Sequence, residues 1–101
     1  MIHTPKKNLN FGQALERLKN GDLVARQGWN GKNMHLWLKQ GFEIKTEFCK
    51  DPILKSLCEN NNGSIIGLPT ICMKTADNKV MTGWVPTQTD MFAEDWFVVE
   101  Y

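Results

Sequence analysis

Short apolar segments separated by turn-forming residues recur along this chain, and they constrain its fold more than any other feature. Runs of four to six residues that alternate apolar and polar, or are apolar throughout, are typical of β-strands, because successive side chains of a strand point to opposite faces. Between such runs, Gly28–Gly31 and Asp77-Asn78 are rich in residues that favour turns. The predicted strands are 23–26, 34–39, 70–74, 80–85 and 96–99.

A helix is predicted before the first strand. Asn10 can cap its N-terminus, and Gly21 can end it. The apolar residues at helical spacing are Phe11, Ala14, Leu15 and Leu18. We therefore expect an α+β fold, with one small antiparallel sheet of about five strands, the N-terminal helix packed on it, and a helical insertion. The last strand, 96–99, is apolar on both sides, so we expect it to be central or at an interface.

The chain is expected to form a single domain over residues 1–101, since 101 residues suit one domain. Residues 1–9 are expected to form an irregular arm. Residues 40–67 are interpreted as an insertion that contains a helix starting at Asp51-Pro52, because Pro is favoured at the first helical position. A short helix capped by Thr89-Asp90 is expected to reach Glu94.

Charge excludes some functions. The net charge is +1, whereas a domain that binds DNA or RNA polymers is usually strongly basic. The charge is uneven, at +5 over residues 1–50 and −4 over residues 51–101. This asymmetry fits an ordinary solvated surface, a basic pocket for an anionic ligand, or charge matching between subunits. No apolar segment is long enough for a membrane span, and the first residues do not resemble a signal peptide, so a soluble intracellular protein is expected.

The sequence offers little support for catalysis. The two Ser residues lie outside any nucleophile motif, and no phosphate-binding glycine loop is present. A pair of His35 with Cys72 has no local signature, so a buried structural Cys is the simpler interpretation. The three Cys lack the spacing of a zinc site, and free thiols fit a reducing cytosol. We predict no catalytic residues, no metal and no cofactor.

Two segments favour ligand binding. Residues 26–32 combine Arg26, Trp29, Asn30 and Lys32, which offer an indole for stacking and cations for phosphate oxygens. Residues 84–90 add hydroxyl, amide and carboxylate groups that suit ribose hydroxyls and base edges. Each has a structural alternative: Trp29 can plug the end of the sheet, Arg26 can be a solvated strand residue, and Thr89 or Asp90 can simply cap the short helix.

These segments also carry a family resemblance. The matching motifs are Phe11-Gly12-x-Ala14-Leu15, Val24-Ala25-Arg26-x-Gly28-Trp29-Asn30-Gly31-Lys32-x-Met34, Lys74-Thr75-Ala76-Asp77, Trp84-Val85-Pro86-Thr87-Gln88-Thr89-Asp90 and Ala93-Glu94-Asp95-Trp96. In this order they resemble a family of short phage and bacterial proteins that includes the second type of Thoeris anti-defence protein. The resemblance runs from about residue 9 to 99, apart from 40–67, where the chain departs from shorter members.

The resemblance implies a sponge that acts in the cytoplasm of an infected bacterium. Such a protein sequesters, without degrading it, a glycocyclic ADP-ribose signal made by a TIR-domain enzyme. It also implies a homotetramer built as a dimer of dimers, with ligand pockets between subunits. Binding of cyclic dinucleotides of CBASS defence is a further activity that varies within the family. Two alternatives remain: an enzyme that cleaves the signal, and a direct protein inhibitor of a host defence enzyme.

The resemblance also implies roles for particular residues. Trp29 and Trp84 are candidates for packing against adenine or ribose, while Trp37 and Trp96 fit the core or an interface. Phe11 is a candidate pocket wall or core residue. The candidates for diphosphate, ribose and base contacts are Arg26, Lys32, Asn30, Thr87, Gln88 and Asp90. In the 40–67 segment, Phe42, Phe48 and Ile53 could line or cover a pocket, or thicken a dimer.

Overall fold

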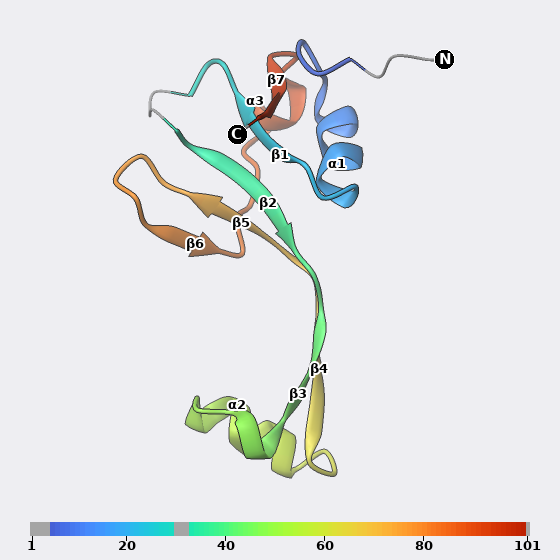
Figure 1. The fold of residues 1–101 in the computed structure, drawn as a ribbon, viewed down its shortest axis with the longest axis vertical. Coiled ribbons are helices and arrows are strands. Elements are labelled where there is room, and N and C mark those ends of the chain that lie inside the picture. The colour runs from blue at the N-terminus through green and yellow to red at the C-terminus, as the bar shows by residue number, and fades with distance from the viewer. Residues whose placement is uncertain (1–4, 30–32, 101) are drawn as a thin grey trace. The chain divides into compact units, whose positions relative to one another are not determined.

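Two antiparallel sheets form in the computed structural model, which describes residues 5–29 and 33–100 (Figure 1). They belong to two separate units of the chain. One unit is built from the segments before residue 40 and after residue 70, and the other is Gln40–Thr70. The predicted insertion, 40–67, falls within the second unit. Within the described residues, no helix has the length and apolar character needed to cross a bilayer.

The larger sheet confirms the predicted fold class, with five strands in an α+β arrangement. Strands β1 (Leu23–Arg26) and β2 (His35–Lys39) pair antiparallel and form the first predicted hairpin. Strands β5 (Thr70–Lys74) and β6 (Val80–Thr82) form the second. The order across the sheet is β6-β5-β2-β1-β7.

Helix α1 (Phe11–Lys19) covers one face of this sheet. Its N-terminus has a capping box, in which Asn10 accepts from the Gln13 amide and the Gln13 side chain accepts from the Asn10 amide. After the helix, Gly21 adopts a φ of 92°, the left-handed conformation that glycine tolerates best. The predicted start and end are therefore confirmed. The core between helix and sheet contains Leu9, Ala14, Leu18, Val24, Leu36, Met73 and Trp96.

Strand β7 (Trp96–Val99) is the last strand of the sheet, beside β1. The expectation of a central strand is wrong as regards strand order. The outer edge of β7 is nevertheless covered, because Leu9 exchanges two backbone hydrogen bonds with Trp96 and the Val98 amide donates to the Lys6 carbonyl. This pairing satisfies edge groups that would otherwise be exposed. Leu9 itself is buried in the core, so the end of the predicted arm is part of the fold.

The second unit contains a two-stranded sheet and a helix. Strand β3 (Phe42–Lys45) pairs with β4 (Ser64–Gly67), and between them lie the 3₁₀ helix η1 (Thr46–Phe48) and helix α2 (Pro52–Glu59). Asp51 caps α2 and Pro52 is its first residue, as predicted. Strand β4 was not among the predicted strands, because Ser64-Ile65-Ile66-Gly67 neither alternates apolar with polar residues nor is apolar throughout.

Candidate functional site

The predicted binding segments meet at the end of the large sheet, where Arg26 is held by two carboxylates. Its Nη1 donates to Oδ1 of Asp90 at 2.7 Å, and its Nε donates to Oδ1 of Asp95 at 2.9 Å. The Arg26 side chain is only 13% exposed. Strand pairing places Arg26 opposite Trp96, which brings Asp95 close to the guanidinium. The interpretation of Arg26 as a solvated strand residue is therefore wrong.

These contacts shift the pKa of each of the three paired side chains. The hydrogen bond to Asp95 raises the pKa of Arg26 and the bond to Asp90 adds to this, although burial acts against it. The hydrogen bond from Arg26 lowers the pKa of Asp95 below its ordinary value. For Asp90, burial is the largest single effect and raises the pKa. Hydrogen bonds, first from the Thr87 amide and then from Arg26, together outweigh burial and lower the pKa of Asp90. All three groups are thus charged at neutral pH.

Gly28 brings the backbone close to the same ion cluster. Its amide donates to Oδ2 of Asp95 at 2.8 Å. A Cβ at this position would lie 2.9 Å from that oxygen and 3.3 Å from a nitrogen of Arg26, so a larger residue would push against the pair. The anion that this amide contacts is therefore a side chain of the protein itself.

Asp90 organises the second binding segment. Helix α3 (Gln88–Phe92) begins after Thr87, whose hydroxyl accepts from the Asp90 amide, while Oδ2 of Asp90 accepts from the Thr87 amide at 2.9 Å. The capping alternative for Asp90 is confirmed, as third residue of a capping box. The predicted boundaries are wrong, because Thr87 and not Thr89 is the N-cap, and the helix ends at Phe92 before reaching Glu94.

Three indole rings pack together beside the ion cluster. Trp96 is fully buried, and Trp29 and Trp84 lie edge-on to it with ring centroids 5.3 and 6.3 Å away. Trp29 also donates from Nε1 to Oδ1 of Asp90 at 3.3 Å. Phe11 reaches the cluster through a 5.6 Å contact with Trp96. The prediction that Trp96 belongs to the core is confirmed, and Trp29 and Trp84 are only partly buried.

The structure therefore brings most of the predicted site residues together. Arg26, Trp29, Trp84, Thr87 and Asp90 form one connected cluster, with Phe11 behind it and Gln88 exposed on α3. Asn30 and Lys32 lie outside the described residues. Asp95 was not among the predicted site residues. A usable signal was its place in the recognised motif Ala93-Glu94-Asp95-Trp96, directly before the predicted strand 96–99.

The chemistry of this cluster suits ligand packing better than acid–base work. Arg26 is paired with two carboxylates, and both carboxylates have lowered pKa values, so neither is poised to exchange a proton near neutral pH. Two partly exposed indoles and the exposed side chain of Gln88 remain available to a flat, polar ligand, whereas the Thr87 hydroxyl already bonds to Asp90. Among the residues that the structure describes, no group of three His, Cys, Asp or Glu side chains could hold a metal ion.

Comparison with known proteins gives two matches. Residues 9–99 match the family model of the Thoeris anti-defense 2-like domain. The chain is also 46% identical over 94 residues to a protein of Bacillus phage SP01 named Thoeris anti-defense 2, an alignment that covers 93% of this chain and 98% of that protein. Because so little of either chain is left unaligned, the phage protein has a counterpart to most of residues 40–67.

Proposed function

The chain belongs to the Thoeris anti-defense 2-like family, and we propose that it is a non-enzymatic sponge that binds and sequesters a glycocyclic ADP-ribose signal. It is an anti-defence protein of the Thoeris type. The observation that carries the proposal is the 46% identity to a named anti-defence protein over nearly the whole of both chains. In this proposal the protein acts in the cytoplasm of the infected bacterium. Cyclic dinucleotides of CBASS defence are a second proposed ligand class.

The aromatic and ion cluster supports this proposal at the level of chemistry. An indole that stacks on a nucleobase contributes about 1–3 kcal/mol to binding. We propose that Trp29 and Trp84 pack against the adenine or ribose, and that Gln88 bonds to the polar edge of the base. The Thr87 hydroxyl donates its proton to Asp90, so toward the ligand it acts as a hydrogen-bond acceptor. Arg26 then contributes by fixing the loops, since its charge is paired inside the chain. Asn30 and Lys32 stay candidate ribose and diphosphate partners.

We propose that the protein works as a homotetramer, a dimer of dimers. A sponge must compete with a receptor, which calls for nanomolar binding, about −12 kcal/mol. Affinity of that kind for a small charged ligand requires near-complete enclosure, and a pocket between subunits provides it. The residues 40–70 unit also exposes large apolar side chains that favour association. These side chains are Phe48 at 78%, Ile53 at 73%, Leu57 at 46%, Ile66 at 66% and Leu68 at 81% exposure.

The oligomer can be tested by light scattering after gel filtration. The expected mass is four times the 11.6 kDa of one chain. Ile53→Glu places a charge on the exposed apolar face of α2, so it should reduce the mass. Lys55→Glu changes the charge of an exposed residue on the same helix and should leave the mass unchanged. A monomeric parent protein, or a tetramer that tolerates Ile53→Glu, would contradict this interface.

The sponge is tested by recovering the ligand. The protein is incubated with glycocyclic ADP-ribose, passed over a desalting column and denatured, and the released nucleotide is analysed by mass spectrometry. Unchanged nucleotide, at a fixed ratio to protein, is the expected result. A linear or hydrolysed product would instead favour an enzyme. Absence of nucleotide, with a host protein co-purifying from infected cells, would favour direct inhibition of a defence enzyme.

Two variants locate the site. Trp29→Ala should abolish ligand retention while the tetramer persists, and loss of the tetramer would show that Trp29 is needed for assembly. Because Trp29 also packs on Trp96, Gln88→Ala provides a milder change at an exposed position. It should weaken retention, whereas Gln40→Ala, an exposed Gln of the other unit, should not. Equal retention by the Gln88 and Gln40 variants would remove Gln88 from the site.

A further inference from the structure

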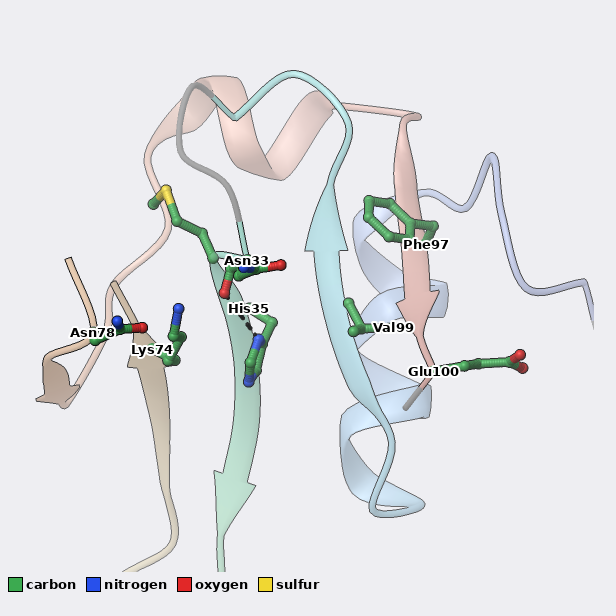
Figure 2. A pocket seen from close by; sticks show the side chains of 8 residues that line it. Asn33, His35, Lys74, Asn78, Phe97, Val99 and Glu100 are labelled. Carbon is green, nitrogen blue, oxygen red and sulfur yellow. Dashed lines mark hydrogen bonds between the residues drawn. The ribbon is translucent and has the colours of Figure 1, made fainter. Parts of the chain in front are cut away.

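Asp95 connects the end of β1 to the start of β7. Three successive residues donate hydrogen bonds to it: Arg26 from Nε to Oδ1 at 2.9 Å, Gln27 from its amide to the Asp95 carbonyl oxygen at 3.1 Å, and Gly28 from its amide to Oδ2 at 2.8 Å. The strand register produces this arrangement, because Arg26 pairs with Trp96. Figure 2 views the sheet from the face opposite α1 and shows the end of β1 beside the start of β7, where Phe97 is labelled. One residue therefore holds the segment that leads from β1 to Trp29.

The hydrogen bonds that Trp29 makes itself are longer. Its amide donates to the Arg26 carbonyl oxygen at 3.3 Å, and its Nε1 donates to Oδ1 of Asp90 at 3.3 Å. The usual N···O distance of such bonds is about 2.7–3.2 Å, so both are weaker than average. The Gly28 bond to Asp95, at 2.8 Å, is shorter and has a charged acceptor. Because Gly28 directly precedes Trp29, this bond restricts the position of the indole more than the hydrogen bonds of Trp29 itself.

Order in segment 26–29 before the ligand arrives favours binding. A side chain that is already ordered loses less conformational freedom on binding, so affinity increases without a further contact. We propose that Asp95 is a positioning residue, which holds segment 26–29 so that the indole of Trp29 is in place before the ligand binds. This rests on the proposed sponge function, in which Trp29 packs against the ligand. In this role Asp95 does not contact the ligand, and both of its carboxylate oxygens bond to the chain.

Two variants test this role in the ligand-free protein. Asp95→Ala removes both side-chain acceptors, and Asp95→Asn keeps a single acceptor oxygen for the two donors. In Asp95→Ala the Gly28 amide should exchange with solvent about tenfold faster, the factor expected when one charge-assisted hydrogen bond is lost. The indole N–H signal of Trp29 should also shift in the NMR spectrum. Asp95→Asn should show smaller changes of the same kind, and it provides the measurement if the Ala variant does not fold. If exchange at Gly28 and the indole signal match those of the parent protein, Asp95 does not position Trp29.

Ligand affinity provides the second test. The Kd for glycocyclic ADP-ribose is measured by calorimetry at a temperature at which every variant is folded, so that a loss of stability does not itself change the Kd. Asp95→Ala should raise the Kd about tenfold, and Asp95→Asn should raise it less. Asp22→Ala is the matched control, because the side chains of Asp22 and Asp95 are 34% and 33% exposed and each is paired with a largely buried arginine. Asp22 lies at the other end of β1, so its variant should leave the Kd unchanged.

The outcomes distinguish this proposal from the function on which it rests. If the parent protein does not bind glycocyclic ADP-ribose, the sponge proposal fails, and the exchange measurement alone decides whether Asp95 positions Trp29. If the parent protein binds the nucleotide and the Asp95 and Asp22 variants have the same Kd, Asp95 is only structural and the proposal is wrong. A Kd below that of the parent protein would show that Arg26, released from one partner, binds the ligand directly, and this would also overturn the proposal.

Discussion

Replacing Arg26 by Met should destabilise the protein more than removing any exposed charge. Met keeps most of the side-chain length but removes the cation that Asp90 and Asp95 share. The side chains of these two carboxylates are 9% and 33% exposed, so Asp90 in particular cannot recover solvation by water when its partner is lost.

The size of this loss of stability depends on how deeply the two carboxylates are buried. Removing one partner of a buried ion pair costs about 3–5 kcal/mol, and the more exposed Asp95 adds less because solvent screens it. Trp29 and Thr87 still donate to Asp90, which moderates the loss. We therefore expect a loss of about 3 kcal/mol in the free energy of unfolding. For a domain of this size, that corresponds to a fall in Tm of about 12–24 °C.

The assay is urea unfolding followed by tryptophan fluorescence, at one fixed protein concentration because association adds to apparent stability. Lys79→Met is the matched control, since it breaks an ion pair whose members are 78% and 65% exposed and should cost less than about 0.5 kcal/mol. If the free energy of unfolding of the Arg26 variant lies within about 1 kcal/mol of that of the parent protein, the ion cluster does not stabilise the fold. A small loss of stability with complete loss of ligand retention would instead assign Arg26 to direct ligand contact.

Three further outcomes are expected. Thr87→Ala removes an N-cap and should cost about 1 kcal/mol in urea unfolding, whereas Thr89→Ala, which caps nothing, should cost much less. Because the pKa of Asp95 is lower in the folded state, its contribution to stability is complete above about pH 4 and is lost as pH falls through the folded value. The Tm should therefore fall on acidification below pH 4, and fall less in Asp95→Asn. Gly28→Ala should destabilise by about 1–3 kcal/mol through the crowded carboxylate, while Gly12→Ala in a helix should not, as thermal melts can show.

Local patterns made much of the fold predictable. The N-cap Asn10, the stop at Gly21 and the start of α2 at Asp51-Pro52 depend on hydrogen bonds between residues a few positions apart, so a short stretch of sequence specifies them. Apolar alternation likewise located the strands of the large sheet. It failed for β4, because Ser64-Ile65-Ile66-Gly67 neither alternates nor is apolar throughout. For β7 the pattern allowed a central place or an interface, and the strand lies at the end of the sheet, beside the arm.

The sequence alone identified the residues that carry the chemistry of the binding segments. It placed Arg26 and Trp29 in one motif and Asp90 in another. Only the tertiary structure decided what they do to one another. The pairing of β1 with β7 brings Asp90 and Asp95 to Arg26, although they lie 64 and 69 positions away. Contacts at such separation depend on which strands become neighbours, a choice made by burial of the whole sheet and not by any local pattern. As a result Arg26, whose guanidinium was predicted to bind a phosphate, already has two anionic partners in its own chain.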